Sequence, residues 1–189
     1  MTTDNDSPLV VGLVSISDRA SKGVYVDQGV PALRDWFEAA LSSPWRFETR
    51  LIPDERAGIE RTLVELVDAI GCHLVLTTGG TGPAPRDVTP EAIEPLFEKR
   101  IDGFGEEFRR RSWSAPASSP WRSSPDQEGA IGARAMLSRA TAGVVDGTIV
   151  VALPGSPAAV ELGAMLLVDM LPHAVDVASG RHGHHHKKH

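Results

Sequence analysis

Residues 73–92 are HLVLTTGGTGPAPRDVTPEA, and this stretch decides the fold because it joins an apolar run, a glycine-rich loop and the start of a helix. The run at 73–78 is short and rich in β-branched residues, which is typical of a strand buried on both faces of a parallel sheet. The pair Thr89-Pro90 has the residue types of a helix N-cap and a first helical residue. We therefore expect a strand, a loop and a helix in succession, with the partially positive helix end beside the loop.

The same alternation continues on both sides of this stretch. Apolar, β-branched runs predict buried strands at 9–16 and 148–153, and the alternating segment 46–52 predicts an outer strand. Apolar residues at helical spacing predict helices between these strands. The predicted helices cover residues 31–41, 59–70 with Gly71 at the C′ position, the segment from Pro90, and the segment from Ser156-Pro157 to about Leu171.

Strands that alternate with helices of this length indicate right-handed crossovers. We therefore predict an α/β fold that is doubly wound, with a mostly parallel sheet and helices on both faces. In such folds, ligands bind at the carboxyl ends of the strands. Four polar loops directly follow predicted strands and should meet at that edge: SISDR at 15–19, IPDE at 52–55, TTGGTG at 77–82 and LPGSP at 153–157.

Composition narrows the class of protein. The chain has 189 residues, 41% of them hydrophobic, which suits one domain with a substantial core. Its formal net charge of −6 disfavours a general nucleic-acid or acidic-membrane binder, because both need a basic face. The single cysteine, Cys72, has no disulfide partner in the chain and is expected to be a small buried side chain in a reducing compartment. With no apolar run of about 18 residues and a polar start, MTTDNDSP, the sequence predicts a cytoplasmic protein.

The predicted domain spans residues 9–175. Within it, the Ser- and Pro-rich segment 112–129 shows no sustained periodicity and is expected to form a partly mobile surface loop. The end of the chain, 176–189, contains the run RHGHHHKKH. We expect it to be a flexible His-rich tail, although a tail of this composition could also bind metal.

The glycine loop has the chemistry of an oxyanion site. Gly79, Gly80 and Gly82 lack a Cβ, so the backbone can adopt positive φ and bring N–H groups close to a ligand, and Thr78 and Thr81 add hydroxyls. The loop has no Walker lysine and does not match the dinucleotide pattern G-x-G-x-x-G. Nucleotide binding would therefore need another geometry. The alternative is a tight strand-to-helix turn with no ligand.

Two aspartates are expected at the same edge of the sheet. Asp87 follows the glycine loop and Asp54 follows the strand at 46–52. Such carboxylates could hold Mg²⁺ against phosphate oxygens for nucleotidyl transfer. The alternative for Asp54 is a structural cap on the next helix.

Other polar residues near the predicted edge have two interpretations each. Asp18 and Arg19 could contribute to the site or form an exposed ion pair of little energetic value. Ser156 could cap its helix, contact a ligand, or do both. Arg139 could bind a phosphate or be solvated.

Five motifs together resemble the molybdopterin adenylyltransferase family of molybdenum-cofactor biosynthesis, in its bacterial stand-alone form. They occur in the family order over about residues 9–171: VSISDRASKGVY, TRLIPDE, TTGGTGPAPRDVTPEA, AMLSRATAGV and LPGSPAAV. The resemblance implies an α/β fold, a homotrimer and an enzyme that uses MgATP to adenylylate molybdopterin with release of pyrophosphate. It also implies hand-over of the product to a molybdenum insertase.

Transferred motif by motif, the resemblance assigns catalysis and tentative Mg²⁺ binding to Asp54 and Asp87. It places the substrates against the loops that carry Ser17, Thr78, Gly79, Gly80, Thr81, Gly82, Pro154, Gly155 and Ser156. Two other functions stay open: a related paralogue that binds pterin without catalysis, and a nucleotide hydrolase that uses the same magnesium–phosphate geometry.

Overall fold

The computed structural model describes residues 8–24, 26, 28–40, 45–114 and 135–168. The strands are β1 (Leu9–Ile16), β2 (Trp45–Ile52), β3 (Leu74–Thr78), β4 (Lys99–Arg100), β5 (Thr141–Val145) and β6 (Thr148–Leu153). The helices are α1 (Asp18–Ser21), α2 (Gly29–Ala40), α3 (Arg56–Val64), α4 (Thr89–Ile93), α5 (Asp102–Ser114) and α7 (Pro157–Val168), with a π-helical segment η1 (Glu65–Ala69) and a 3-10 segment η2 (Glu94–Leu96).

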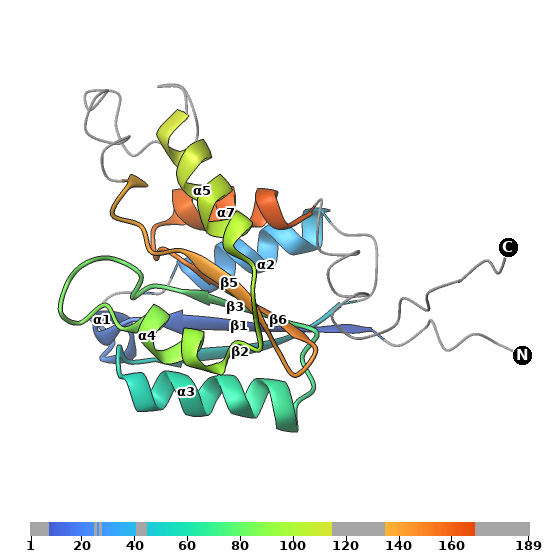
Figure 1. The fold of residues 1–189 in the computed structure, drawn as a ribbon. Helices are drawn as coiled ribbons and strands as arrows, with labels where there is room; N and C mark the ends of the chain where they lie inside the picture. Colours follow the sequence, from blue (N-terminus) through green and yellow to red (C-terminus); the bar gives the residue numbers. More distant parts are fainter. Residues whose placement is uncertain (1–7, 25, 27, 41–44, 115–134, 169–189) are drawn as a thin grey trace, which may run out of the picture.

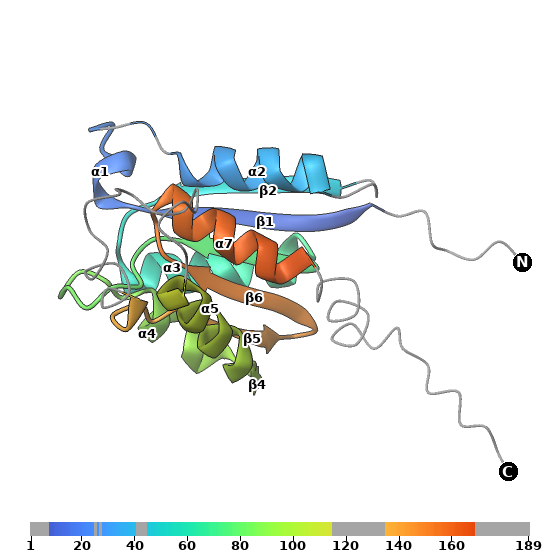
Figure 2. The ribbon, with the colours of Figure 1, turned by 90° about the horizontal axis from the view of Figure 1, so that it is seen from above.

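The strands form one six-stranded sheet in the order β2-β1-β3-β6-β5-β4. The first four are parallel to one another, whereas β5 and β4 run antiparallel to their neighbours. Helices α2, α5 and α7 cover one face of the sheet, and α3 and α4 cover the other (Figure 1). The view from above shows α2 and α7 lying along the strands (Figure 2). The doubly wound, mostly parallel fold predicted from the sequence is confirmed.

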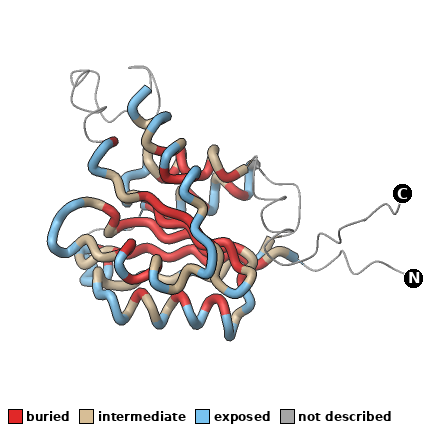
Figure 3. Tube along the Cα trace, in the orientation of Figure 1, coloured by how far each residue is buried: buried red, intermediate tan, exposed pale blue. Residues whose placement is uncertain are grey.

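Two apolar clusters hold this arrangement together, one on each face of the sheet. Successive side chains of β1 alternate between them: Val11 and Leu13 pack with Leu33 and Phe37 of α2, whereas Val14 packs against α3. The central strands are buried along their length (Figure 3). Burial on both faces explains why these strands are continuous apolar runs rather than alternating ones.

The outer strand β2 differs from its neighbours. It alternates between half-buried and exposed residues, as its position at the edge of the sheet requires. Its exposed edge has charges: Arg50 lies 2.6 Å from Glu65 and 3.8 Å from Glu48, and Arg46 lies 3.7 Å from Glu48. The prediction of an outer strand at 46–52 is confirmed.

Strands β4 and β5 and helices α1 and α5 were not predicted from the sequence. Strands β5 and β6 form a hairpin through Asp146-Gly147, which have φ of 43° and 76°. Positive φ at both turn residues is the geometry of the tightest hairpins, and Asp-Gly is their usual sequence. Helix α5 packs onto the core through Phe104 and Phe108.

Helix α5 also shortens the predicted loop at 112–129. Its last three residues, 112–114, are helical, and the rest of the loop lies outside the described residues. The His-rich tail at 176–189 and the expected helix end near Leu171 also lie outside them. Gly71 has φ of 71° at the end of the α3–η1 helix, as a C′ glycine should. Within the described ranges, none of the helices is both long and apolar enough to cross a membrane.

Candidate functional site

The four parallel strands end at one edge of the sheet. In their register, Ile16 is paired with Ile52, and Thr78 is paired with both Ser15 and Leu153. The loops that follow these strands therefore leave the sheet side by side. The Ser17 N–H donates to the Ile52 carbonyl at 2.9 Å, which joins the first two loops directly. The predicted convergence of the four polar loops is confirmed.

The glycine loop is built by close backbone approaches. Gly79 and Gly80 have φ of 106° and 63°, a conformation that side chains with a Cβ rarely adopt. The Gly79 N–H donates to the Leu153 carbonyl at 3.0 Å, so the loop is attached to the end of β6. The expectation of positive φ is wrong for Gly82. A side chain is still excluded there, because a Cβ would lie 2.7 Å from Asp87 Oδ2.

The LPGSP loop lies directly against the glycine loop. The Thr78 hydroxyl donates to the Pro154 carbonyl at 3.2 Å, and a Cβ on Gly155 would lie 3.3 Å from Gly79 Cα. Ser156 accepts the Ala159 N–H at 3.3 Å and so caps α7, as one of its predicted roles requires. Ser17 caps α1 in the same way, accepting the Ala20 N–H at 3.2 Å.

Helix α4 begins one residue earlier than the sequence predicts. Thr89 is its first residue rather than its N-cap, and the Thr89 hydroxyl donates to the Gly79 carbonyl at 2.9 Å. Its N–H donates to the Gly80 carbonyl at 3.0 Å. Fully buried, Thr89 fixes the glycine loop instead of exposing helix N–H groups to a ligand. Helix α4 has only five residues, so its dipole adds little to the site.

Asp54 and Asp87 lie against the same glycine loop. A Cβ on Gly80 would be 3.0 Å from Asp54 Oδ1, and one on Gly82 would be 2.7 Å from Asp87 Oδ2. Each carboxylate has one oxygen held by a backbone N–H: Asp54 Oδ2 accepts from Asp18 at 2.8 Å and Asp87 Oδ2 accepts from Ala84 at 2.9 Å. The structure therefore brings the two predicted aspartates together.

The structural alternative for Asp54 is wrong. The N-cap residue of α3 is Glu55, and no side chain caps that helix. The Asp54 carboxylate instead faces the loop after β1 and binds the backbone of Asp18.

Asp18 pairs with Arg86 rather than with Arg19, its expected partner. Arg86 donates to Asp18 Oδ2 from Nε at 3.0 Å and from Nη2 at 2.6 Å. These bonds lower the pKa of Asp18 below its ordinary value. Arg86 immediately precedes Asp87, so the ion pair joins the loop that carries Asp87 to the one that carries Asp18.

Asp54 has the opposite electrostatic environment. Partial burial raises the pKa of Asp54 above the ordinary carboxyl value, and the charges of Asp18 and Asp87 raise it further, while the hydrogen bond from the Asp18 N–H opposes them. A cation placed between Asp54 and Asp87 would relieve this repulsion.

The residues fit a magnesium ion that is shared with a substrate. Among the described residues, no three His, Cys, Asp or Glu side chains cluster as a complete metal cage. Mg²⁺ does not need one, since it usually binds one or two carboxylates together with substrate phosphates and water. Asp54 and Asp87, placed on either side of a loop with no Cβ at Gly80 or Gly82, provide that donor set.

Arg139 is a partly exposed side chain whose guanidinium is bonded mainly to groups of the protein. Its guanidinium donates to the Gly82 carbonyl from Nε at 3.1 Å and from Nη2 at 2.8 Å, and to the Asp87 carbonyl at 2.6 Å. Its Nη1 pairs with Glu91. The interpretation of Arg139 as a merely solvated side chain is therefore wrong, whereas phosphate binding by Arg139 stays a prediction.

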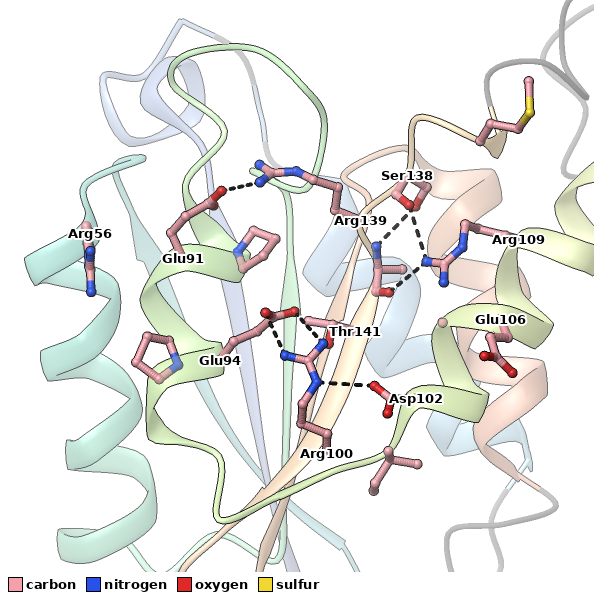
Figure 4. Close-up of a pocket in the computed structure, with 16 residues that line it drawn as sticks. Arg56, Glu91, Glu94, Arg100, Asp102, Glu106, Arg109, Ser138, Arg139 and Thr141 are labelled. Carbon is pink, nitrogen blue, oxygen red and sulfur yellow. Dashed lines mark hydrogen bonds and ion pairs between the residues drawn. The ribbon is translucent and has the colours of Figure 1, made fainter.

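A cavity of about 970 Å³ adjoins this region on the far side of Arg139. Figure 4 shows its walls, formed by α4 and η2, by Arg100, by α5 and by residues 138–141. Two of its four arginines are paired with carboxylates that line it, in the pairs Arg100–Glu94 and Arg139–Glu91. Arg109 instead donates to the Ser138 and Ala140 carbonyls, at 3.4 and 3.3 Å.

The fold and this edge define a class: an open α/β sheet protein with an acidic, glycine-lined ligand site at the carboxyl ends of its parallel strands. A family model described as a probable molybdopterin binding domain matches residues 12–173. The chain belongs to this molybdopterin-binding family.

The chain is also similar in sequence to individual proteins of known activity. The chain is 36% identical over 172 residues to a molybdopterin adenylyltransferase of Helicobacter pylori, a match that covers 91% of this chain and 89% of the relative. It is 62% identical over 104 residues to a molybdopterin adenylyltransferase of Escherichia coli, covering 55% of this chain. That match spans about half of the E. coli relative, 53% of its length.

Solved structures share the fold. The molybdopterin biosynthesis enzyme MoaB of Thermus thermophilus superposes with a TM-score of 0.73 at 32% identity. The superposition covers 91% of this chain and 97% of the other.

Proposed function

We propose that the protein is a molybdopterin adenylyltransferase, which transfers the adenylyl group of ATP to molybdopterin. The observation that carries the proposal is the placement of Asp54 and Asp87 against one glycine loop at the carboxyl edge of the sheet. The similarity to molybdopterin adenylyltransferases of Helicobacter pylori and Escherichia coli supports it.

The reaction is a displacement at phosphorus. A terminal phosphate oxygen of molybdopterin attacks the α-phosphorus of ATP; a new P–O bond forms, the bond to the bridging α–β oxygen breaks, and pyrophosphate leaves with that electron pair. Adenylyl-molybdopterin is the other product. The protein's contribution is to align the two phosphates and to offset their charge.

Asp54 and Asp87 would hold Mg²⁺, which when bound supplies positive charge to the phosphate oxygens. The open oxygen of Asp54 lies beside Gly80, and Asp87 lies beside Gly82. The missing Cβ atoms let both carboxylates approach the backbone of the glycine loop closely. Neither aspartate is required as a covalent nucleophile.

The other loop residues would bind the two substrates. Backbone and hydroxyl groups at this edge are assigned to this role in Ser17, Thr78, Gly79, Gly80, Thr81, Gly82, Pro154, Gly155 and Ser156. Several of them already have structural partners, such as Thr78 with Pro154 and Ser156 with Ala159. Their contribution is therefore a fixed cradle rather than a set of mobile ligands.

We propose a homotrimer in the cytoplasm that hands its product to a molybdenum insertase. The family resemblance supports these three assignments. The pathway consumes an activated pterin, so an enzyme that inserts the metal must accept the adenylylated product.

Purified protein supplied with molybdopterin and MgATP should form adenylyl-molybdopterin and pyrophosphate in equal amounts. Asp54→Asn and Asp87→Asn each keep the shape of the side chain and should lower turnover about 100-fold, as loss of a charge-stabilising group does. Asp68→Asn is the matched control, because Asp68 is exposed in η1. It should leave turnover unchanged.

Two outcomes would favour the other functions. Tight pterin binding without any product, in protein that binds MgATP, would indicate a binding paralogue. Steady ATP consumption without pterin would indicate a nucleotide hydrolase. Either result would overturn the proposed transferase.

A further inference from the structure

The segment that carries Asp87 projects from the sheet edge. Residues 83–86, between Gly82 and Asp87, are exposed. Inside the segment, the Asp87 N–H donates to the Ala84 carbonyl at 2.9 Å and the Ala84 N–H donates to Asp87 Oδ2 at 2.9 Å. These two bonds shape the turn but do not attach it to the rest of the protein.

Two side chains attach the turn to the rest of the protein: Arg86 pairs with Asp18 near its tip, and Arg139 holds its base. Arg139 Nη2 donates to the carbonyls of Gly82 and Asp87, at 2.8 and 2.6 Å, so one nitrogen bridges the two ends of the turn. Nε adds a second bond to Gly82 at 3.1 Å. Glu91 pairs with the remaining side of the guanidinium, Nη1, and anchors it to α4.

We propose that Arg139 is a positioning residue that holds Asp87 in place for the transfer reaction. The inference rests on the proposed function for its kinetic consequence, while the attachment itself belongs to the free protein. A guanidinium has five N–H donors, and four of them are used by Gly82, Asp87 and Glu91. Arg139 therefore acts on the reaction through the position of Asp87.

Only arginine can make this arrangement. Its planar fork reaches two carbonyls and a carboxylate at once, whereas a lysine is a point charge that can keep only part of the set. The backbone of residue 139 is attached independently, because its N–H donates to the Thr81 carbonyl at 3.0 Å. Replacing the side chain should therefore loosen the base of the turn, where Asp87 lies, and leave the path of the chain and the Arg86–Asp18 pair intact.

The first experiment measures amide hydrogen exchange in the free protein. In Arg139→Gln, a peptide covering residues 81–89 should exchange about tenfold faster than in the wild type, since charge-assisted hydrogen bonds are lost at both ends of the turn. Arg139→Lys should be intermediate. Arg100→Gln is the matched control: Arg100 lines the same cavity and pairs with Glu94 and Asp102, but it has no bond to the turn. Exchange in its 81–89 peptide should match the wild type.

The second experiment measures adenylyl transfer in the same proteins. Arg139→Gln should lower kcat about 100-fold with the KM for ATP changed less than about threefold, because a misplaced group costs rate rather than ground-state binding. The half-saturating Mg²⁺ concentration should rise about tenfold, and Arg139→Lys should recover part of kcat. Arg100→Gln should retain wild-type values.

Each outcome separates the two claims. Unchanged exchange in Arg139→Gln overturns the positioning role, even if the wild type is an active transferase. A wild type without transferase activity overturns the proposed function, even if exchange accelerates as expected. Equal losses of kcat in Arg139→Gln and Arg100→Gln would show a general effect of cavity charge and would also overturn the inference.

Discussion

Asp18 and Asp54 hold each other by reciprocal hydrogen bonds from backbone to side chain. The Asp18 N–H donates to Asp54 Oδ2 at 2.8 Å, and the Asp54 N–H donates to Asp18 Oδ1 at 3.3 Å. The pair joins the ends of β1 and β2. It also places a second negative charge beside Asp54, which helps to raise the pKa of that carboxyl.

The Asp18–Asp54 pair predicts a shift in the pH profile of the proposed adenylyl transfer. A carboxyl with a raised pKa loses its charge as the pH falls through that value, and Asp54 would then lose its proposed hold on Mg²⁺. Asp18→Asn removes a repulsive charge, so the pKa of Asp54 should fall and the acidic limb of the rate profile should move to lower pH. Rates measured with saturating substrates across the acidic range test this. A limb that moves to higher pH would contradict the assignment of Asp54.

Gly80 should not tolerate a side chain. A Cβ there would collide with the Thr89 hydroxyl and lie 3.0 Å from Asp54 Oδ1, and φ is already 63°. We expect Gly80→Ala to lower the free energy of unfolding by about 1–3 kcal/mol and to reduce turnover. Denaturant titration and rate measurements would show this. Gly103→Ala is the control, because a Cβ on Gly103 meets no atom within 4 Å.

Cys72 should be unreactive in the folded protein. Burial raises the pKa of Cys72 to about 11, so the thiolate that reacts with alkylating agents is scarce at pH 8. Iodoacetamide should label the denatured protein rapidly and the native protein slowly, as mass spectrometry can measure. Equal rates would show that the thiol is exposed.

Phe37 belongs to the apolar core on the face of the sheet that α2 covers, and replacing it tests that core. It is fully buried and stacks edge-on against Trp36, with ring centroids 5.3 Å apart. Phe37→Ala should cost about 3–5 kcal/mol of unfolding free energy. Trp113→Ala removes a side chain that is 55% exposed and should cost less than about 0.5 kcal/mol. Similar costs for the two variants would contradict the assigned core.

The predictable part of the fold is the part with a strong local pattern. The runs 9–16 and 148–153 are apolar because both faces of the central strands are buried, so their identity as strands follows from the sequence. Strand β5 and its hairpin were missed, although Asp146-Gly147 is a recognisable turn signal. Helix α5 contributes Phe104 and Phe108 as its large buried side chains, a pattern too sparse to indicate a helix.

The candidate site also has features that the sequence predicts and features that it does not. The meeting of Asp54 and Asp87 was predictable, since both follow strands that end at one edge of the sheet. The contacts of Arg139 were not, because its partners include backbone carbonyls whose positions depend on the tertiary path of the chain. Asp18 pairs with Arg86 and not with the expected Arg19 for the same reason, because the tertiary path of the chain brings Arg86 to Asp18.

The two edge strands of the sheet have a consequence for behaviour at high concentration. The edge strand β4 is only two residues long, and both residues, Lys99 and Arg100, are exposed. The other edge strand, β2, carries the charges of Arg46 and Glu48. An approaching strand from another molecule would find too short a template on one side and would have to desolvate ions on the other. The two edge strands therefore disfavour aggregation by edge-to-edge strand pairing during synthesis and storage.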